Sequence, residues 1–231
     1  MSLDLAPGDG AEVTCLLGQA GSTEEVDRLV RKYRDPGEVE ESLKRTIAWW
    51  DRLTGTIQVN TPEKSVDILL NRWLPYQTLS SRIWGRTGFY QSSGAFGFRD
   101  QLQDAMALLY AEPAIARRHI LLAAGRQFIE GDVQHWWQPP SGAGIRTRCS
   151  DDMLWLPYAA AHYVRFTGDA EILNERIPFI EDRSLDEKEH EVFMTPRESL
   201  ESATLYEHCR RAIGRGLRTG AHGLPLIGSG D

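Results

Sequence analysis

The chain has 231 residues, of which 41% are hydrophobic and 26% are charged, and its formal net charge is −7 at pH 7. This length and apolar content suffice for a packed core in one large domain or two small ones. Acidic and basic residues are interspersed along the chain, so no basic face is available to phosphate backbones or anionic lipid. Nucleic acid and membrane surfaces are therefore excluded as partners.

The cysteines and the N-terminal residues indicate a cytoplasmic chain without direct membrane contact. The chain has an odd number of cysteines, which are Cys15, Cys149 and Cys209. They lack metal-ligand spacing, which favours reduced thiols. All apolar runs fall short of the roughly 20 residues that a membrane-spanning helix requires. Residues 1–7 lack the basic region and the apolar stretch of a signal peptide.

The first 60 residues predict one strand followed by two helices. Residues 11–18 form a short, partly alternating apolar run that is typical of a strand, and a single strand requires partners. Ser22 and Glu25 have the spacing of a capping box for a helix that ends at residues 35–37. Apolar positions within residues 39–53 predict a second amphipathic helix. We interpret the two helices as a connector.

Beyond residue 60, apolar residues recur with helical spacing, and strand signals are nearly absent. Helices are predicted over about residues 65–81, 100–110, 113–129, 151–166 and 199–219, with a shorter one near 170–177. Apolar helices that alternate with aromatic loops are typical of stacked helical hairpins. The sequence therefore predicts a mainly α fold.

Three segments combine aromatic residues with carboxylates, amides and guanidinium groups. They cover residues 89–104, 131–137 and 146–155. Tryptophan rings stack on the C–H surfaces of sugars, while the polar groups pair with sugar hydroxyls. These segments predict a carbohydrate site on the loops.

Glycine and serine patterns exclude two other kinds of site. The glycines at 142–144 and 214–216 are too sparse for a dinucleotide or phosphate-loop motif, and neither pair follows a convincing strand. Residues 92–94 lack the flanking glycines of a nucleophile elbow. We therefore expect neither a nucleotide site nor a serine hydrolase.

Six segments, in the same order, resemble the catalytic domain of glycoside hydrolase family 94. They are Asn71–Gln77, Gly97–Asp104, Gln127–Trp137, Ser150–Pro157, Leu205–Cys209 and His222–Asp231. The similarity runs from about residue 15 to residue 231. Within the family it is strongest to the phosphorylase-like C-terminal region of the cyclic β-1,2-glucan synthases.

The resemblance implies a partial (α/α)6 barrel of the six-hairpin glycosidase kind. Residues 1–20 would be the end of a β-sandwich domain that includes the predicted strand. Residues 21–60 would be a helical linker, and residues 61–231 the N-terminal part of a truncated barrel. The relatives also imply a homodimer and an inner-membrane anchor for the complete protein.

The implied reaction is inverting phosphorolysis of a β-linked glucan or gluco-oligosaccharide, with the β-1,2 linkage favoured. A carboxylic acid protonates the glycosidic oxygen while inorganic phosphate attacks the anomeric carbon, so phosphate is a co-substrate and no cofactor is required. The product is α-glucose 1-phosphate.

The family general acid is expected beyond the end of this chain. Residues 228–231 continue in the family into Asp-Trp-Asn-Asp-Gly, and the acid is the second aspartate of that motif, whereas Asp231 matches the first. The chain is therefore interpreted as a fragment that contains no catalytic residue and is inactive alone. Two alternatives are a catalytically silent carbohydrate-binding element and an α/α-barrel hydrolase, which would need a second carboxylate to activate water.

The first candidate substrate-binding residues lie at the start of a predicted helix. Asp100 matches the family aspartate that hydrogen-bonds the glucosyl unit in the −1 subsite, or else it caps the helix. Three roles are open for Arg99: it contacts sugar, it orients Asp100, or it bridges two helices. For Asp104 in the same region a structural role is favoured.

The remaining candidates are Gln134, His135, Trp136, Trp137, Arg146 and Asp152. The two tryptophans, expected on a loop, either line a cleft or plug the barrel wall. Two roles are open for Arg146 and Arg148. They either reach sugar or phosphate, or they pair with Asp151 and Asp152, and the ion pair is preferred for Arg148.

For one aspartate and two histidines of these regions, a structural role is weighed against a functional one. Asp152 either binds sugar or caps a helix together with Ser150. His135 is not a metal ligand, because no second histidine or cysteine lies at ligand spacing. His208 lies within an amphipathic helix and is interpreted as structural.

Overall fold

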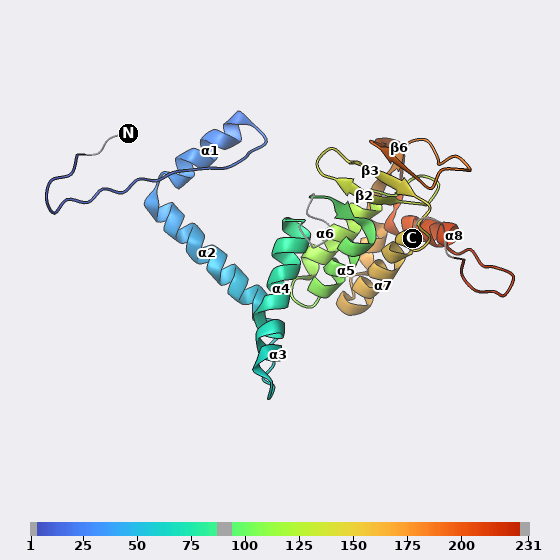
Figure 1. Ribbon diagram of the computed structural model, residues 1–231, viewed down its shortest axis with the longest axis horizontal. Helices are drawn as coiled ribbons and strands as arrows, with labels where there is room; N and C mark the ends of the chain where they lie inside the picture. Colours follow the sequence, from blue (N-terminus) through green and yellow to red (C-terminus); the bar gives the residue numbers. More distant parts are fainter. Residues whose placement is uncertain (1–3, 87–93, 227–231) are drawn as a thin grey trace. The chain divides into compact units, whose positions relative to one another are not determined.

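The computed structural model describes residues 4–86 and 94–226 and is mainly helical, with short antiparallel strands (Figure 1). The chain divides into two compact units, Met1–Arg52 and Leu53–Asp231. Residues 89–93 of the first polar segment and Asp231 lie outside the described residues. Among the described helices, none is long and apolar enough to cross a membrane.

The first unit contains the two helices that the sequence predicts. Helix α1 (Thr23–Tyr33) begins after Ser22, whose hydroxyl accepts from the backbone amide of Glu25, and the Glu25 carboxylate accepts from the amide of Gly21. Helix α2 (Pro36–Thr54) follows. These contacts satisfy amide groups that a helix N-terminus leaves without partners.

The predicted strand at residues 11–18 is wrong. These residues have no regular secondary structure, and their side chains are exposed. A strand requires a neighbour to accept and donate its backbone hydrogen bonds, and no described segment pairs with this one. An alternating apolar pattern is therefore not sufficient to form a strand at residues 11–18.

The second unit begins with a helical stretch from residue 64 to residue 84. Helices α3 (Lys64–Ile68) and α4 (Leu74–Gln77) alternate with two π-helical segments, Leu69–Trp73 and Thr78–Trp84. The sequence predicts one helix over almost this range. The π-helical turns are local adjustments that periodicity does not detect.

Four further helices form the body of this unit: α5 (Phe98–Leu108), α6 (Pro113–Ala124), α7 (Trp155–Thr167) and α8 (Leu205–Gly216). The sequence predicts all four, and the first residue of α6 is the expected proline. Two short 3-10 helices, η3 (Asp152–Leu154) and η4 (Ala170–Asn174), are present as well.

The structure describes six strands after residue 60 within residues 61–86 and 94–226, so the expectation of almost no strands there is wrong. Strands β1 (Phe96–Gly97), β2 (Gln134–Gln138), β3 (Ala143–Thr147) and β5 (Glu191–Met194) form an antiparallel sheet in that order. Strands β4 (Arg176–Glu181) and β6 (Arg197–Thr204) form a second sheet. Strands β2, β3 and β6 lie together at one end of the helix group (Figure 1).

Two predicted helices and one predicted loop contain strands instead. Residues 199–204, predicted as the start of a helix, belong to β6, and residues 176–177 belong to β4. These two segments hydrogen-bond to each other, and this long-range pairing overrides the local helical preference. Residues 134–137, predicted as a loop, belong to β2, which has a bulge near His135.

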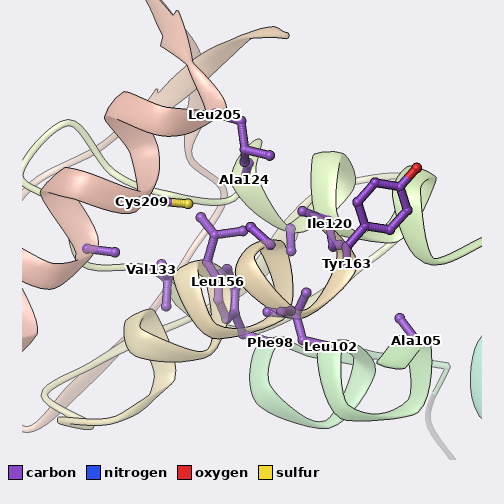
Figure 2. Close-up of a cluster of buried hydrophobic side chains, with 14 of the residues drawn as sticks. Phe98, Leu102, Ala105, Ile120, Ala124, Val133, Leu156, Tyr163, Leu205 and Cys209 are labelled. Atoms are coloured by element: carbon purple, nitrogen blue, oxygen red, sulfur yellow. The ribbon is translucent and has the colours of Figure 1, made fainter. Parts of the chain in front are cut away.

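The core is formed by the facing sides of α5, α6, α7 and α8. Figure 2 shows the side chains of this cluster, among them Phe98, Leu102, Ile120, Leu156 and Leu205. Alanines on α5, α6 and α7 are buried among them, and such small side chains allow helices to approach closely. Burial of these apolar faces stabilises the unit.

Truncation of a core residue tests this packing. Leu156 is 0% exposed, so Leu156→Ala removes buried atoms and leaves a cavity, and we expect the free energy of unfolding to fall by roughly 2–5 kcal/mol. Leu200 is exposed on β6, so Leu200→Ala should change it by less than about 0.5 kcal/mol. Urea unfolding followed by circular dichroism measures both. Equal losses for the two variants would contradict the assignment of the core.

Candidate functional site

Strand pairing brings the start of α5 beside the second polar segment. Phe96 pairs with Trp137 and Gly97 pairs with Trp136, and α5 begins directly after β1. The N-terminal turn of α5 is therefore held next to β2, although the two segments are far apart in sequence. A third segment, residues 149–155, contacts both and contains η3.

The shortest polar contact in this region joins His135 to Asp152. The Nδ1 atom of His135 lies 2.6 Å from Oδ2 of Asp152, whose side chain is only 2% exposed. This hydrogen bond raises the pKa of His135 above its ordinary value of 6.5, against the opposing effect of burial. Oδ1 of Asp152 is buried and has no hydrogen-bond partner among the described residues. It retains capacity to accept a hydrogen bond.

Asp151, next in the chain to Asp152, connects three elements. Its carboxylate lies 3.0 Å from Nη1 of Arg99 and accepts from the thiol of Cys149 and from Nε1 of Trp155. Burial acts to raise the pKa of Asp151, but these three hydrogen bonds together lower it. Arg99 therefore bridges α5 to the segment before α7, as one of the sequence alternatives proposed.

Asp100 lies in the first turn of α5 and is half-buried. The N-cap residue is Gly97, so the alternative that Asp100 is the N-cap of this helix is wrong. The charges of Asp100 and Arg99 both influence the pKa of His135. Four of the eight candidates, Arg99, Asp100, His135 and Asp152, are thus brought together, and we call them the polar cluster.

The other four candidates lie mostly in the protein interior. Trp137 is 1% exposed and packs against Phe96 and Phe98, so it fills the core rather than lining a cleft. Gln134 is buried and donates to the carbonyl oxygen of Gly142. Trp136 is half-buried beside Phe193.

Arg146 forms a buried ion pair that the sequence does not predict. Its guanidinium donates two hydrogen bonds of 2.7 Å to Asp132 and one of 3.1 Å to Glu130, and it lies over the ring of Phe128. Burial acts to lower the pKa of Arg146, but the two carboxylates raise it. The alternative that Arg146 pairs with the aspartates at 151 and 152 is therefore wrong.

Arg148 likewise has no ion pair with Asp151 or Asp152, which corrects the preferred prediction. Its guanidinium donates to the backbone carbonyl oxygens of Glu189 and Asp186, at 2.7 and 2.6 Å. The segment of residues 182–190 lies close to the end of β3, and this contact could not be inferred from sequence separation. Ser150 is not the N-cap of η3 or α7, in contrast to the sequence prediction.

Two residues for which a structural role was predicted have one. Asp104 pairs with Arg82 at 2.9 Å, although burial raises the pKa of Asp104 in spite of that pair. Nε2 of His208 donates to the carbonyl oxygen of Ile177 and the ring stacks on Phe179, and burial lowers the pKa of His208. Neither belongs to the polar cluster.

The sequence did not identify Cys149 as part of this region. Ligand atoms of His135, Cys149 and Asp152 lie within 4.8 Å of one another, a combination that resembles a metal site. The Nδ1 to Oδ2 distance of 2.6 Å is shorter than the separation of roughly 3.3 Å expected for two ligands of one zinc ion. The geometry is that of a hydrogen-bonded pair.

The chain belongs to the glycosyl hydrolase 94 superfamily, whose catalytic-domain family model matches residues 49–231. It is 47% identical to cyclic beta-(1,2)-glucan synthase NdvB of Rhizobium meliloti (strain 1021) over 234 residues, which cover 100% of this chain and 8% of that protein. The resemblance predicted from the six segments is thereby confirmed.

Two shorter relatives are phosphorylases. Solabiose phosphorylase of Paenibacillus borealis is 31% identical over 77% of this chain and 22% of its own length. The 1,2-beta-oligoglucan phosphorylase of Listeria innocua serovar 6a is 27% identical over 80% of this chain and 17% of its own length. The chain therefore spans less than a quarter of each of these three relatives.

The pKa of His135 gives a test of the polar cluster. Asp152→Asn removes the carboxylate that stabilises the imidazolium, so we expect the midpoint of the His135 titration to fall, as measured by NMR of the ring protons. Glu187→Gln, in an exposed segment, should leave the midpoint unchanged. An unchanged midpoint in Asp152→Asn would contradict the assigned contact.

The same contact has a predicted effect on stability against pH. Because the pKa of His135 is raised in the folded state, its contribution is fully present below 6.5 and is lost as the pH rises through the folded-state pKa. The stability difference between the wild type and Asp152→Asn should therefore shrink as the pH rises from 6 to 9. Urea unfolding at several pH values measures it, and a difference that grows with pH would contradict this sign.

The buried ion pair of Arg146 predicts a large effect of its removal. Arg146→Met leaves Asp132 buried without a countercharge, and we expect a loss of roughly 3–5 kcal/mol in the free energy of unfolding. The matched control is Arg183→Met, whose pair with Glu189 is solvent-exposed and should contribute far less. Urea unfolding compares the two, and similar midpoints would contradict a buried role for Arg146.

Proposed function

We propose that this chain is part of a glycoside phosphorylase that cleaves a β-linked glucan, with β-1,2 linkages favoured. Inorganic phosphate is the attacking co-substrate and α-glucose 1-phosphate is the product. Membership of the family and the phosphorylase relatives support this class of reaction. The β-1,2 linkage is suggested by the names of two relatives, the cyclic glucan synthase and the oligoglucan phosphorylase.

The polar cluster is proposed to bind the glucosyl unit that is transferred. The observation that carries this assignment is the convergence of Arg99, Asp100, His135 and Asp152 from three separate segments. Carboxylate oxygens accept from sugar hydroxyls, and imidazole and guanidinium groups donate to them. Trp136, which is half-buried on β2, offers part of its ring for stacking.

The fixed orientation of the cluster favours recognition of one sugar geometry. Asp152 is held by His135, and Arg99 is held by Asp151, so neither side chain loses much rotational freedom when a ligand binds. Oδ1 of Asp152 is buried without a described partner, and a hydroxyl donor would remove the cost of leaving it unsatisfied. Such prepositioned groups suit a rigid pyranose ring.

Asp151 is unsuited to be the acid that protonates the glycosidic oxygen. A general acid must be protonated near the working pH, whereas the hydrogen bonds from Cys149, Arg99 and Trp155 lower the pKa of Asp151 below its ordinary value. We propose that the acid lies outside residues 1–231 and that this chain is inactive alone.

We also propose that α5 to α8 form part of an (α/α)6 barrel that further helices complete. In this proposal residues 61–231 belong to the barrel, residues 21–60 form a linker and residues 1–20 end a preceding domain. The helices that pack around one core support the barrel, and the two-helix connector supports the linker.

The reaction is tested by incubating the chain with β-1,2-gluco-oligosaccharides and inorganic phosphate, in parallel with a longer chain that continues past residue 231. We expect glucose 1-phosphate from the longer chain only. Release by the 231-residue chain would show that one of its own carboxyl groups is the acid. A longer chain that folds and binds the glucan without releasing product would support a silent carbohydrate-binding role instead.

The role of the polar cluster is tested in the longer chain. Asp100→Asn removes a charged acceptor, and we expect kcat/KM for phosphorolysis to fall by roughly 100-fold or more. Glu187→Gln should leave kcat/KM unchanged, because this residue lies in an exposed segment. Calorimetric titration with a gluco-oligosaccharide separates loss of binding from loss of chemistry. Wild-type kinetics in Asp100→Asn would exclude Asp100 from the site.

A further inference from the structure

Three side chains that can bind a metal ion meet at the polar cluster. One ligand atom each from His135, Cys149 and Asp152 lies within 4.8 Å of the other two. His135 is on β2, whereas Cys149 and Asp152 follow β3, and the antiparallel pairing of these strands brings the three residues together. An imidazole nitrogen, a thiolate sulfur and a carboxylate oxygen are the kinds of ligand that zinc takes in proteins. We call the three residues the ligand group.

Hydrogen bonds hold the ligand group in its present geometry. Nδ1 of His135 lies 2.6 Å from Oδ2 of Asp152, and the thiol of Cys149 lies 3.2 Å from a carboxylate oxygen of Asp151. A zinc ion replaces the hydrogen in contacts of this kind, and the displaced protons pass to the solvent. The hydrogen-bonded pair is therefore the arrangement from which a zinc ion would form its bonds.

The movements that zinc requires are small. Two ligand atoms of one tetrahedral zinc ion lie roughly 3.3–3.6 Å apart, so the Nδ1 to Oδ2 distance of 2.6 Å has to lengthen by roughly 0.7 Å. The sulfur of Cys149 is within 4.8 Å of the other ligand atoms and has to approach them by no more than roughly 1.3 Å. Side-chain rotations supply movements of this size.

An unsatisfied oxygen supports a ligand at this place independently of the distances. Oδ1 of Asp152 is buried and has no hydrogen-bond partner among the described residues, although the side chain is only 2% exposed. A buried acceptor without a partner costs free energy, and coordination of a cation by this carboxylate offsets that cost. Rotation of the carboxylate also lets either of its two oxygens bind the ion.

The local charge favours a cation. Asp151 and two polar cluster residues, Asp100 and Asp152, place three carboxylates near His135, whereas the cluster contains one guanidinium, that of Arg99. Zinc bound to the Cys149 thiolate and the Asp152 carboxylate forms a complex without net charge. Such a complex costs less free energy to bury than an isolated ion does.

The ligand group can be reached without unfolding of the chain. The side chain of His135 is 35% exposed. Cys149 lines a cavity of about 270 Å³, which can hold several water molecules at roughly 30 Å³ each. We propose that Nδ1 of His135, Sγ of Cys149 and the carboxylate of Asp152 bind one zinc ion, with a water molecule as the fourth ligand.

Zinc at this site acts as an inhibitor rather than as a cofactor. The ion occupies His135 and Asp152, which are two of the four residues of the polar cluster, so a sugar and the ion compete for the same groups. This consequence rests on the proposed function of the polar cluster. Binding of the metal itself does not.

The test of metal binding is a titration of the chain with cobalt(II), which occupies zinc sites and has a visible spectrum. We expect one cobalt ion per chain, a charge-transfer band from a bound thiolate, and loss of both on addition of zinc. Cys149→Ser should abolish the thiolate band. His135→Gln should weaken cobalt binding by roughly tenfold or more, since it removes a ligand. Circular dichroism verifies that both variants are folded.

The other two cysteines provide the controls. Cys209 is buried as Cys149 is, and burial raises the pKa of the Cys209 thiol to about 12, so this residue does not supply a thiolate near neutral pH. Cys15 is exposed. Cys209→Ser and Cys15→Ser should each retain the band. The proposal is overturned if the wild type has no thiolate band, or if either control variant loses it.

The inhibitory consequence is measured in the longer chain, by adding zinc during phosphorolysis. We expect the wild type to be inhibited, and Cys149→Ser to require at least roughly tenfold more zinc for the same fractional inhibition. Full activity of a wild type that is saturated with metal would contradict the inhibitory role. Because the cobalt spectrum is recorded without glucan, absence of phosphorolysis leaves the test of metal binding intact.

Discussion

The pairing of β1 with β2 is the constraint on which the candidate site depends. On the β1 side the described pairing involves Phe96 and Gly97, and these two residues fix where α5 begins. Trp137, buried against Phe96 and Phe98, holds this short pairing in the apolar core. Because the start of α5 and β2 are joined in this way, Arg99 and Asp100 lie within reach of His135 and the 149–155 segment.

The arginines near the candidate site are held by two kinds of partner, carboxylates and backbone carbonyl oxygens. Arg99 and Arg146 pair with aspartates and connect elements that are distant in sequence. Arg148 is oriented instead by the backbone carbonyl oxygens of Glu189 and Asp186. Residues 146–152 thus contribute Asp152 to the polar cluster and Arg146 to an ion pair in the protein interior.

Much of the helical framework could be predicted from the sequence, and the sheets could not. The buried stripes of α6 and α7 repeat with helical spacing, which is a local signal. Strand β6 also carries a pattern compatible with a helix, and its identity depends on pairing with β4. Residues 11–18 show the converse, since a strand-like pattern without a described partner remains irregular.

The sequence by itself determined the family, the mainly helical framework and the segments that contain the polar residues, because order and periodicity are properties of the chain alone. Only the tertiary structure decided which polar residues meet. It joined His135 to Asp152, paired Arg146 with Asp132 and directed Arg148 to backbone carbonyl oxygens. The physical reason is that ion pairs and hydrogen bonds act over a few ångströms, and the distances between side chains depend on strand pairing and helix packing rather than on sequence separation.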